Sequence, residues 1–202
     1  MDIRALLSQI VKRTGNLLVK PADEWQIISR EHSPRHKIIA RYALPYIIAI
    51  AAANFLGSLI FSPFGFSFLY LLLDTVSAFA IPFAMIHIAA FIINMLSGIF
   101  NSKKDIDSAF NLVIYAFTAS WLSLILSGLF PGLHVVIFIA GLYWIYIFWT
   151  GISIMMDTPE SHKISYVIVA VLIILCCEII LSIISRSVIG LTNTWLNFAI
   201  GF

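Results

Sequence analysis

The sequence predicts an all-α polytopic membrane protein, with five transmembrane helices and an N-terminal amphipathic helix in the cytosol. Hydrophobic residues make up 61% of the chain and charged residues only 11%, whereas soluble domains carry about 25% charged residues. The mean hydropathy of +1.00 leaves too little polar surface to cover a soluble globule. The apolar residues also fall in long runs, broken by short polar segments. These observations exclude a soluble domain, a disordered chain, a nucleic-acid-binding protein and a secreted disulfide scaffold.

The N-terminal segment, residues 1–37, is expected to form amphipathic helices on the cytosolic side. Its first helix repeats apolar residues at helical spacing: Ile3, Leu6, Leu7, Ile10, Val11, Leu17 and Leu18. Arg4, Lys12 and Arg13 lie off that face. A basic amphipathic helix suits the inner leaflet, where apolar burial adds to attraction by anionic lipid. Packing on the protein's own cytosolic face is the alternative. A second helix is expected to start at Pro21, because proline fits a first helical turn.

The next region, residues 38–186, is predicted to hold five spans, because a bilayer crossing needs about 20 apolar residues. The runs are 42–61, 68–100, 109–129, 133–156 and 164–185. The first run stops at Ser62-Pro63-Phe64-Gly65. The second is long enough for tilt, a kink at Pro82 or a cytosolic extension. The tail, residues 187–202, is apolar but too short to cross, so we expect an interfacial or partly re-entrant piece on the outer side.

Orientation follows from the placement of Lys and Arg. Eight of the twelve precede the first span: Arg4, Lys12, Arg13, Lys20, Arg30, Arg35, Lys37 and Arg41. Lys103, Lys104 and Lys163 lie in the connections on the same side, and Arg186 alone lies on the other. Positively charged loops stay in the cytosol. The sequence therefore predicts a cytosolic N-terminus and a C-terminus outside.

Two acids, Asp74 and Glu178, lie inside the expected spans, where an ionised group is unfavourable without a partner. From the ends of their runs, both lie roughly 10 Å deep in the outer half, and no Lys or Arg lies within a span. One interpretation is a proton- or cation-linked site. The other interpretation is two neutral carboxylic acids, each hydrogen-bonded to a residue of a neighbouring helix or facing a water-filled depression.

His87 is the third ionisable residue within a span, and it completes the candidate ion or proton site. It shares a helix face with Asn94, and with Asn54 the two can line a polar path. The alternative is hydrogen bonding between helices. His134 is expected near the opposite membrane face, so we predict no metal site. The chain has no Gly-rich phosphate loop, nucleophile elbow or zinc-binding helix motif, so we predict neither an enzyme nor a cofactor.

Small residues at helical spacing predict close helix packing. The third span carries Ala116, Ser120, Ser123 and Ser127, and the first carries Ala53 and Gly57.

Two sequence stretches resemble the prokaryotic branch of the Yip family of Ypt/Rab-interacting membrane proteins. The first is Lys20-Pro21-Ala22-Asp23-Glu24-Trp25-Gln26-Ile27-Ile28, followed by Ser33 and Tyr42-Ala43-Leu44-Pro45. The second is Tyr143-Trp144-Ile145-Tyr146-Ile147-Phe148-Trp149-Thr150-Gly151, then Met155, Met156, Pro159, Lys163 and Tyr166. The resemblance covers about residues 18–186 and implies five spans.

The resemblance also bears on the third span and on partners. Family members of this branch are expected to carry a proline soon after Tyr115-Ala116, but Ala119-Ser120-Trp121 stands there. We therefore expect an unbroken third helix. Eukaryotic members resemble trafficking factors that bind lipidated Rab GTPases, and they carry a long polar N-terminal region and an Asp-Leu-Tyr-Gly-Pro motif. Neither feature is in this sequence, so we do not predict Rab binding.

The sequence thus predicts a non-enzymatic integral membrane protein that organises partners or local bilayer structure. The expected partners are the bilayer itself, with anionic lipid at the cytosolic face, and a second copy or another membrane protein, but no nucleic acid. The resemblance implies a location in the bacterial inner (plasma) membrane. The alternative function is a small proton- or cation-linked transporter or channel that uses Asp74 and Glu178.

Overall fold

The computed structural model describes residues 3–31, 33–61 and 68–200, and every regular element in these ranges is helical. Two N-terminal helices come first, α1 (Ile3–Val19) and α2 (Pro21–Glu31). Pro21 opens α2 and two acids lie in its first turn, as predicted, because negative charge stabilises the positive end of the helix dipole.

The spans follow in chain order. The first joins α3 (Arg35–Ile38), the π-helical turn η1 (Ile39–Ala43) and α4 (Leu44–Phe61). The second is α5 (Phe68–Leu96) and the third is α6 (Ile106–Ala116) with α7 (Thr118–Leu129). The fourth joins η2 (Pro131–Leu133), α8 (His134–Gly141) and α9 (Trp144–Met155), and the fifth is α10 (Glu160–Ile200).

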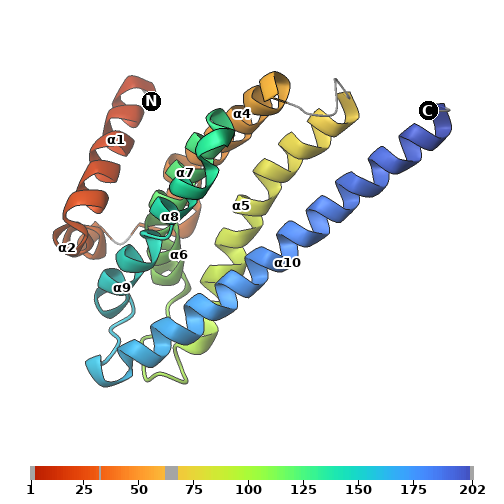
Figure 1. The fold of residues 1–202 in the computed structure, drawn as a ribbon. Helices are drawn as coiled ribbons and strands as arrows, with labels where there is room; N and C mark the ends of the chain where they lie inside the picture. The colour runs from red at the N-terminus through yellow and green to blue at the C-terminus, as the bar shows by residue number, and fades with distance from the viewer. Residues whose placement is uncertain (1–2, 32, 62–67, 201–202) are drawn as a thin grey trace.

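Within the described ranges, four helices are long and apolar enough to cross a membrane, and counting the bent pair α6–α7 as one span gives a fifth. The predicted fold class is confirmed. In Figure 1, α1 and α2 lie on one flank of the bundle and α10 on the other. The expected stop of the first span at residues 62–65 lies outside the described residues.

The prediction of an unbroken third span is wrong. The helix breaks at Phe117 and bends by 40° without a proline. Phe117 has a ψ of −4°, against about −42° in a regular α-helix. Its ring packs edge-on against Trp121 and Trp144, and the hydroxyl of the next residue, Thr118, bonds to Tyr42. Packing to other spans therefore fixes the bend.

The second and fifth spans are each one continuous helix. α5 runs through the buried Pro82, which is compatible with the tilt or kink expected for this span. α10 continues without a break to Ile200, so the backbone of the expected C-terminal tail extends the fifth span up to that residue and is not a re-entrant piece there.

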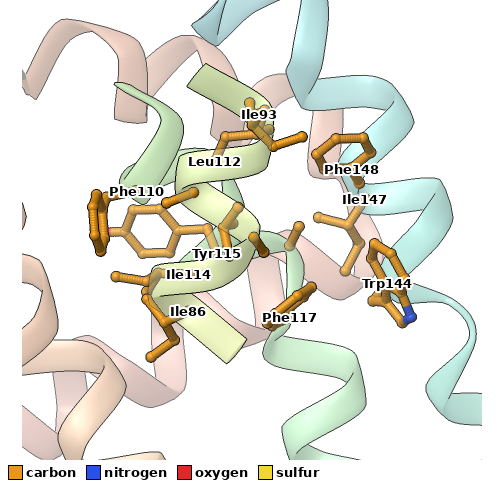
Figure 2. Close-up of a cluster of buried hydrophobic side chains, with 14 of the residues drawn as sticks. Ile86, Ile93, Phe110, Leu112, Ile114, Tyr115, Phe117, Trp144, Ile147 and Phe148 are labelled. Atoms are coloured by element: carbon orange, nitrogen blue, oxygen red, sulfur yellow. The ribbon is translucent and has the colours of Figure 1, made fainter. Parts of the chain in front are cut away.

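The core lies where α5, α6 and α9 meet (Figure 2). The buried side chains there include Ile86, Ile93, Phe110, Leu112, Ile114, Ile147 and Phe148. A second close contact joins α4 to α7. A Cβ added to Gly57 would lie 1.8 Å from the carbonyl oxygen of Gly128. Helix backbones in membranes approach this closely only at small residues, so the expected role of Gly57 is confirmed.

Candidate functional site

The N-terminal helices are held on the bundle by Trp25 of α2. This side chain is fully buried, and its Nε1–H donates to the carbonyl oxygen of Ile147 in α9 at 3.0 Å. The ring also packs edge-on against Tyr115 of α6. Gly151 lies one turn beyond Ile147, and a Cβ there would lie 2.4 Å from the indole. Glycine at this position therefore admits Trp25.

Arg13 of α1 joins the same contact through charge. Its guanidinium pairs with the buried Glu24 at 3.2 Å and with Glu31, and it lies over the Tyr115 ring at 5.4 Å. Asn16 donates to Glu24 at 2.7 Å. Burial alone would lower the pKa of Arg13, but Glu31, Tyr115 and Glu24 together outweigh burial and raise it. Arg13 therefore remains a cation and ties α1 to α2.

Hydroxyl groups tie α1 to the first and third spans. Thr14 forms hydrogen bonds with the hydroxyls of Tyr42 and Tyr46, and Tyr42 bonds in turn to Thr118 at 3.0 Å. Thr118 lies directly after the break at Phe117. Because buried polar groups need partners, these hydroxyls fix α1 beside the bend of the third span.

The exposed part of α1 has two different sides. Ile10, Thr14 and Leu17 are buried against the bundle. On one side of this buried face lie Leu7 and Val11, which are 52% and 70% exposed; we call this pair the apolar shoulder. On the other side, Gln9, Lys12, Arg13 and Asn16 line a groove.

Both interpretations of α1 therefore have support in the structure. The helix packs on the protein's own bundle, and it also keeps an exposed apolar side. Of the three basic residues that the sequence assigned to an interfacial helix, Arg4 and Lys12 are exposed, whereas Arg13 belongs mainly to the internal contact with Glu24 and Glu31.

The two acids of the spans come to one cavity. Asp74 in α5 and Glu178 in α10 both line a space of about 330 Å³ between α4, α5, α7 and α10. Asp74 accepts hydrogen bonds from Asn54 at 2.8 Å and Ser58 at 2.6 Å. Glu178 is partly buried. The cavity is mixed in character, because apolar side chains such as Trp121 also line it.

His87 does not join this cavity. It lies 13 residues beyond Asp74 on α5, which is roughly 20 Å along a helix. Its Nδ1 lies 2.9 Å from the Phe83 carbonyl oxygen, and its ring packs against Phe83 and Phe110. With Asn54 bonded to Asp74, the structure does not bring His87 and Asn54 together in one polar path.

Arg186 enters the sequence-based predictions only as the one positive charge on the outer side and is not among the candidate site residues. Arg186 lines the cavity together with Glu178, Ser182 and Ser185. These four residues are spaced i, i+4, i+7 and i+8 and therefore share one face of α10. This polar stripe is the feature of the sequence that could have predicted that they line the same cavity. His134 of α8 lines the same cavity.

One comparison with known proteins identifies the family. The model of the Yip1 domain matches residues 15–182, most of the 202-residue chain. The chain belongs to the Yip1 family. The matched region includes Trp25, Gly151, the first four spans, the part of the fifth span up to residue 182 and both acids of the cavity, whereas the apolar shoulder of α1 precedes it. Comparisons with curated proteins and with solved structures give no match.

Proposed function

We propose that this Yip1-domain protein is a non-enzymatic integral membrane protein that organises partners or local bilayer structure through α1 and α2. The observation that carries the proposal is the apolar shoulder on a helix that the bundle holds in place. Exposed apolar side chains beside Arg4 suit the boundary between lipid headgroups and acyl chains. Because α1 is fixed by Arg13, Thr14 and its link to α2, it can act on lipid or on a neighbouring helix without first having to fold.

The distribution of charge supports a location and an orientation. Eleven of the twelve Lys and Arg residues lie on the amino-terminal side of the spans, so the positive-inside rule favours a cytosolic N-terminus and a C-terminus outside. Together with the resemblance to prokaryotic members, this charge distribution supports the proposed location in the bacterial inner membrane. The proposed partners are anionic lipid at the cytosolic face and a second copy or another membrane protein.

A lipid-clustering assay tests the apolar shoulder. The two native cysteines of the full chain are replaced, Cys176→Ser and Cys177→Ser, and a dye is attached at Gly15→Cys. Gly15 is exposed, and no atom lies within 4 Å of a Cβ added there. In vesicles, energy transfer to headgroup-labelled phosphatidylglycerol reports lipid enrichment. We expect the added changes Leu7→Gln and Val11→Gln to lower the enrichment at least threefold, because both side chains are exposed and leave the bundle contacts intact.

The control is Val19→Gln, which changes an apolar residue of α1 that is 76% exposed but lies away from the shoulder. It should cluster lipid as the parent protein does. Equal clustering by the double variant would contradict the proposal.

Proton or cation transport is the second candidate function, and one observation favours it: Asp74 and Glu178 line the same cavity. Proton flux into vesicles across a pH gradient tests it, with Asp74→Asn and Glu178→Gln combined in one variant. The hypothesis predicts flux that the variant loses while its thermal unfolding temperature is unchanged. If neither protein shows flux, the acids are structural, as the bonds from Asn54 and Ser58 to Asp74 suggest.

A further inference from the structure

A polar groove of about 440 Å³ lies between α1, α2 and the start of the first span. Four basic residues line it, Lys12, Arg13, Lys37 and Arg41, against two acids. Both acids, Glu24 and Glu31, are engaged by Arg13.

Lys12, Lys37 and Arg41 are therefore the uncompensated charges of the groove. Over the described part of the chain, none of the three has a carboxylate partner, and all three are exposed. Three cations from α1, α3 and η1 around one hollow repel one another. An anion in the groove removes that repulsion and accepts charge-assisted hydrogen bonds from them.

Two features at the groove point independently to a ligand. The Nη1 atom of Arg13 is buried without a hydrogen-bond partner in the described structure, which is unusual for a charged group. Arg41 also lies on the π-helical turn η1. Such turns are rare in proteins overall, but a large share of those that occur lie at functional sites.

The groove is not polar throughout. Leu6, Ile10 and Ile27 line it beside the basic residues, and Ile27 is half exposed. A ligand that matches both parts carries an anionic head and an apolar body. A phosphate ester suits the cations, because its oxygens accept several hydrogen bonds from Lys and Arg.

We propose that this groove binds the phosphate headgroup of an anionic phospholipid, with Lys12, Lys37 and Arg41 as its ligands. This inference rests on the proposed function, and it names the lipid chemistry that α1 and α2 recognise. The glycerol and acyl portion lies against Leu6 and Ile27. The apolar shoulder is on the other side of α1, so it contacts lipid independently of the groove.

Native mass spectrometry of the full chain, titrated with short-chain phosphatidylglycerol, tests the proposal. Lys37→Gln combined with Arg41→Gln is expected to weaken lipid binding at least tenfold. The matched control, Lys20→Gln with Lys104→Gln, removes the same charge from exposed positions outside the groove and should bind as the wild type does. Lys37→Arg with Arg41→Lys should restore binding, because the charge is kept.

Unchanged lipid binding in the Lys37→Gln, Arg41→Gln variant would overturn the proposal. Inorganic phosphate is titrated in parallel, and binding as tight as that of the lipid would overturn the lipid assignment in favour of a soluble phosphate. The shoulder variant Leu7→Gln, Val11→Gln separates this inference from the proposed function. If the Leu7→Gln, Val11→Gln variant still binds phosphatidylglycerol in the groove and also clusters lipid as well as its parent does, the proposed role of the shoulder is wrong. The inference about the groove is then still supported.

Discussion

Replacing Trp25 with Ala is expected to release α2, and α1 with it, from the transmembrane bundle. Trp25 is fully buried, and its Nε1–H bond to Ile147 joins residues far apart in the chain. Trp→Ala changes in protein cores cost about 3–5 kcal/mol. Because the ring belongs to α2 and its contacts are with Tyr115 of α6 and Ile147 of α9, its loss weakens the docking of the N-terminal helices.

Limited trypsin digestion of the purified protein measures this release. The variant should be cut at Lys12, Arg13 or Lys20 at least tenfold faster than the wild type. The control Trp149→Ala removes a half-buried indole of α9 that lies against Lys163. It should leave the N-terminal cleavage rate unchanged. Equal cleavage of Trp25→Ala and wild type would show that Trp25 does not hold α2 in place.

Gly57→Ala is expected to destabilise the bundle itself. The new Cβ would lie 1.8 Å from the Gly128 carbonyl oxygen, and a backbone atom cannot turn aside as a side chain can. Overpacking typically costs about 1–3 kcal/mol, and this contact belongs at the upper end because α4 and α7 must move apart.

Thermal unfolding in detergent, followed by circular dichroism, measures the effect of Gly57→Ala. We expect a lower midpoint and less folded protein, whereas Gly98→Ala, where no atom lies within 4 Å of the added Cβ, should behave as the wild type. A midpoint for Gly57→Ala equal to that of the wild type would contradict the close approach of α4 and α7.

The sequence predicts much of this fold, because the bilayer imposes strong constraints. Every span must satisfy its backbone internally and present apolar side chains for about 20 residues, so hydropathy alone locates the five spans. Local rules also hold at the start of α2, where Pro21 and two acids occupy the first turn. Small-residue spacing predicts that Gly57 lies at a close contact between helices, but it does not identify Gly128 as the partner.

Features that depend on contacts between distant segments could not be predicted in this way. The bend at Phe117 follows from packing against Trp144 and from the Thr118–Tyr42 bond, and no local residue requires it. Trp25 and Gly151 appeared in two separate motifs, and only the fold joins them. The similar depth of Asp74 and Glu178 can be estimated from the sequence, whereas their place in one cavity with Arg186 follows only from how the helices pack.

The fixed position of α1 with its apolar shoulder toward lipid is the central claim of the proposed function. Spin labels at Val11→Cys and Gln9→Cys, each in a Cys176→Ser, Cys177→Ser background and reconstituted in vesicles, test it most directly. The Val11 label should be more accessible to lipid-soluble oxygen, and the Gln9 label, on the groove side, to a water-soluble nickel chelate. Two mobile labels with equal access to the nickel chelate would contradict the claim, because α1 would then lie free in water.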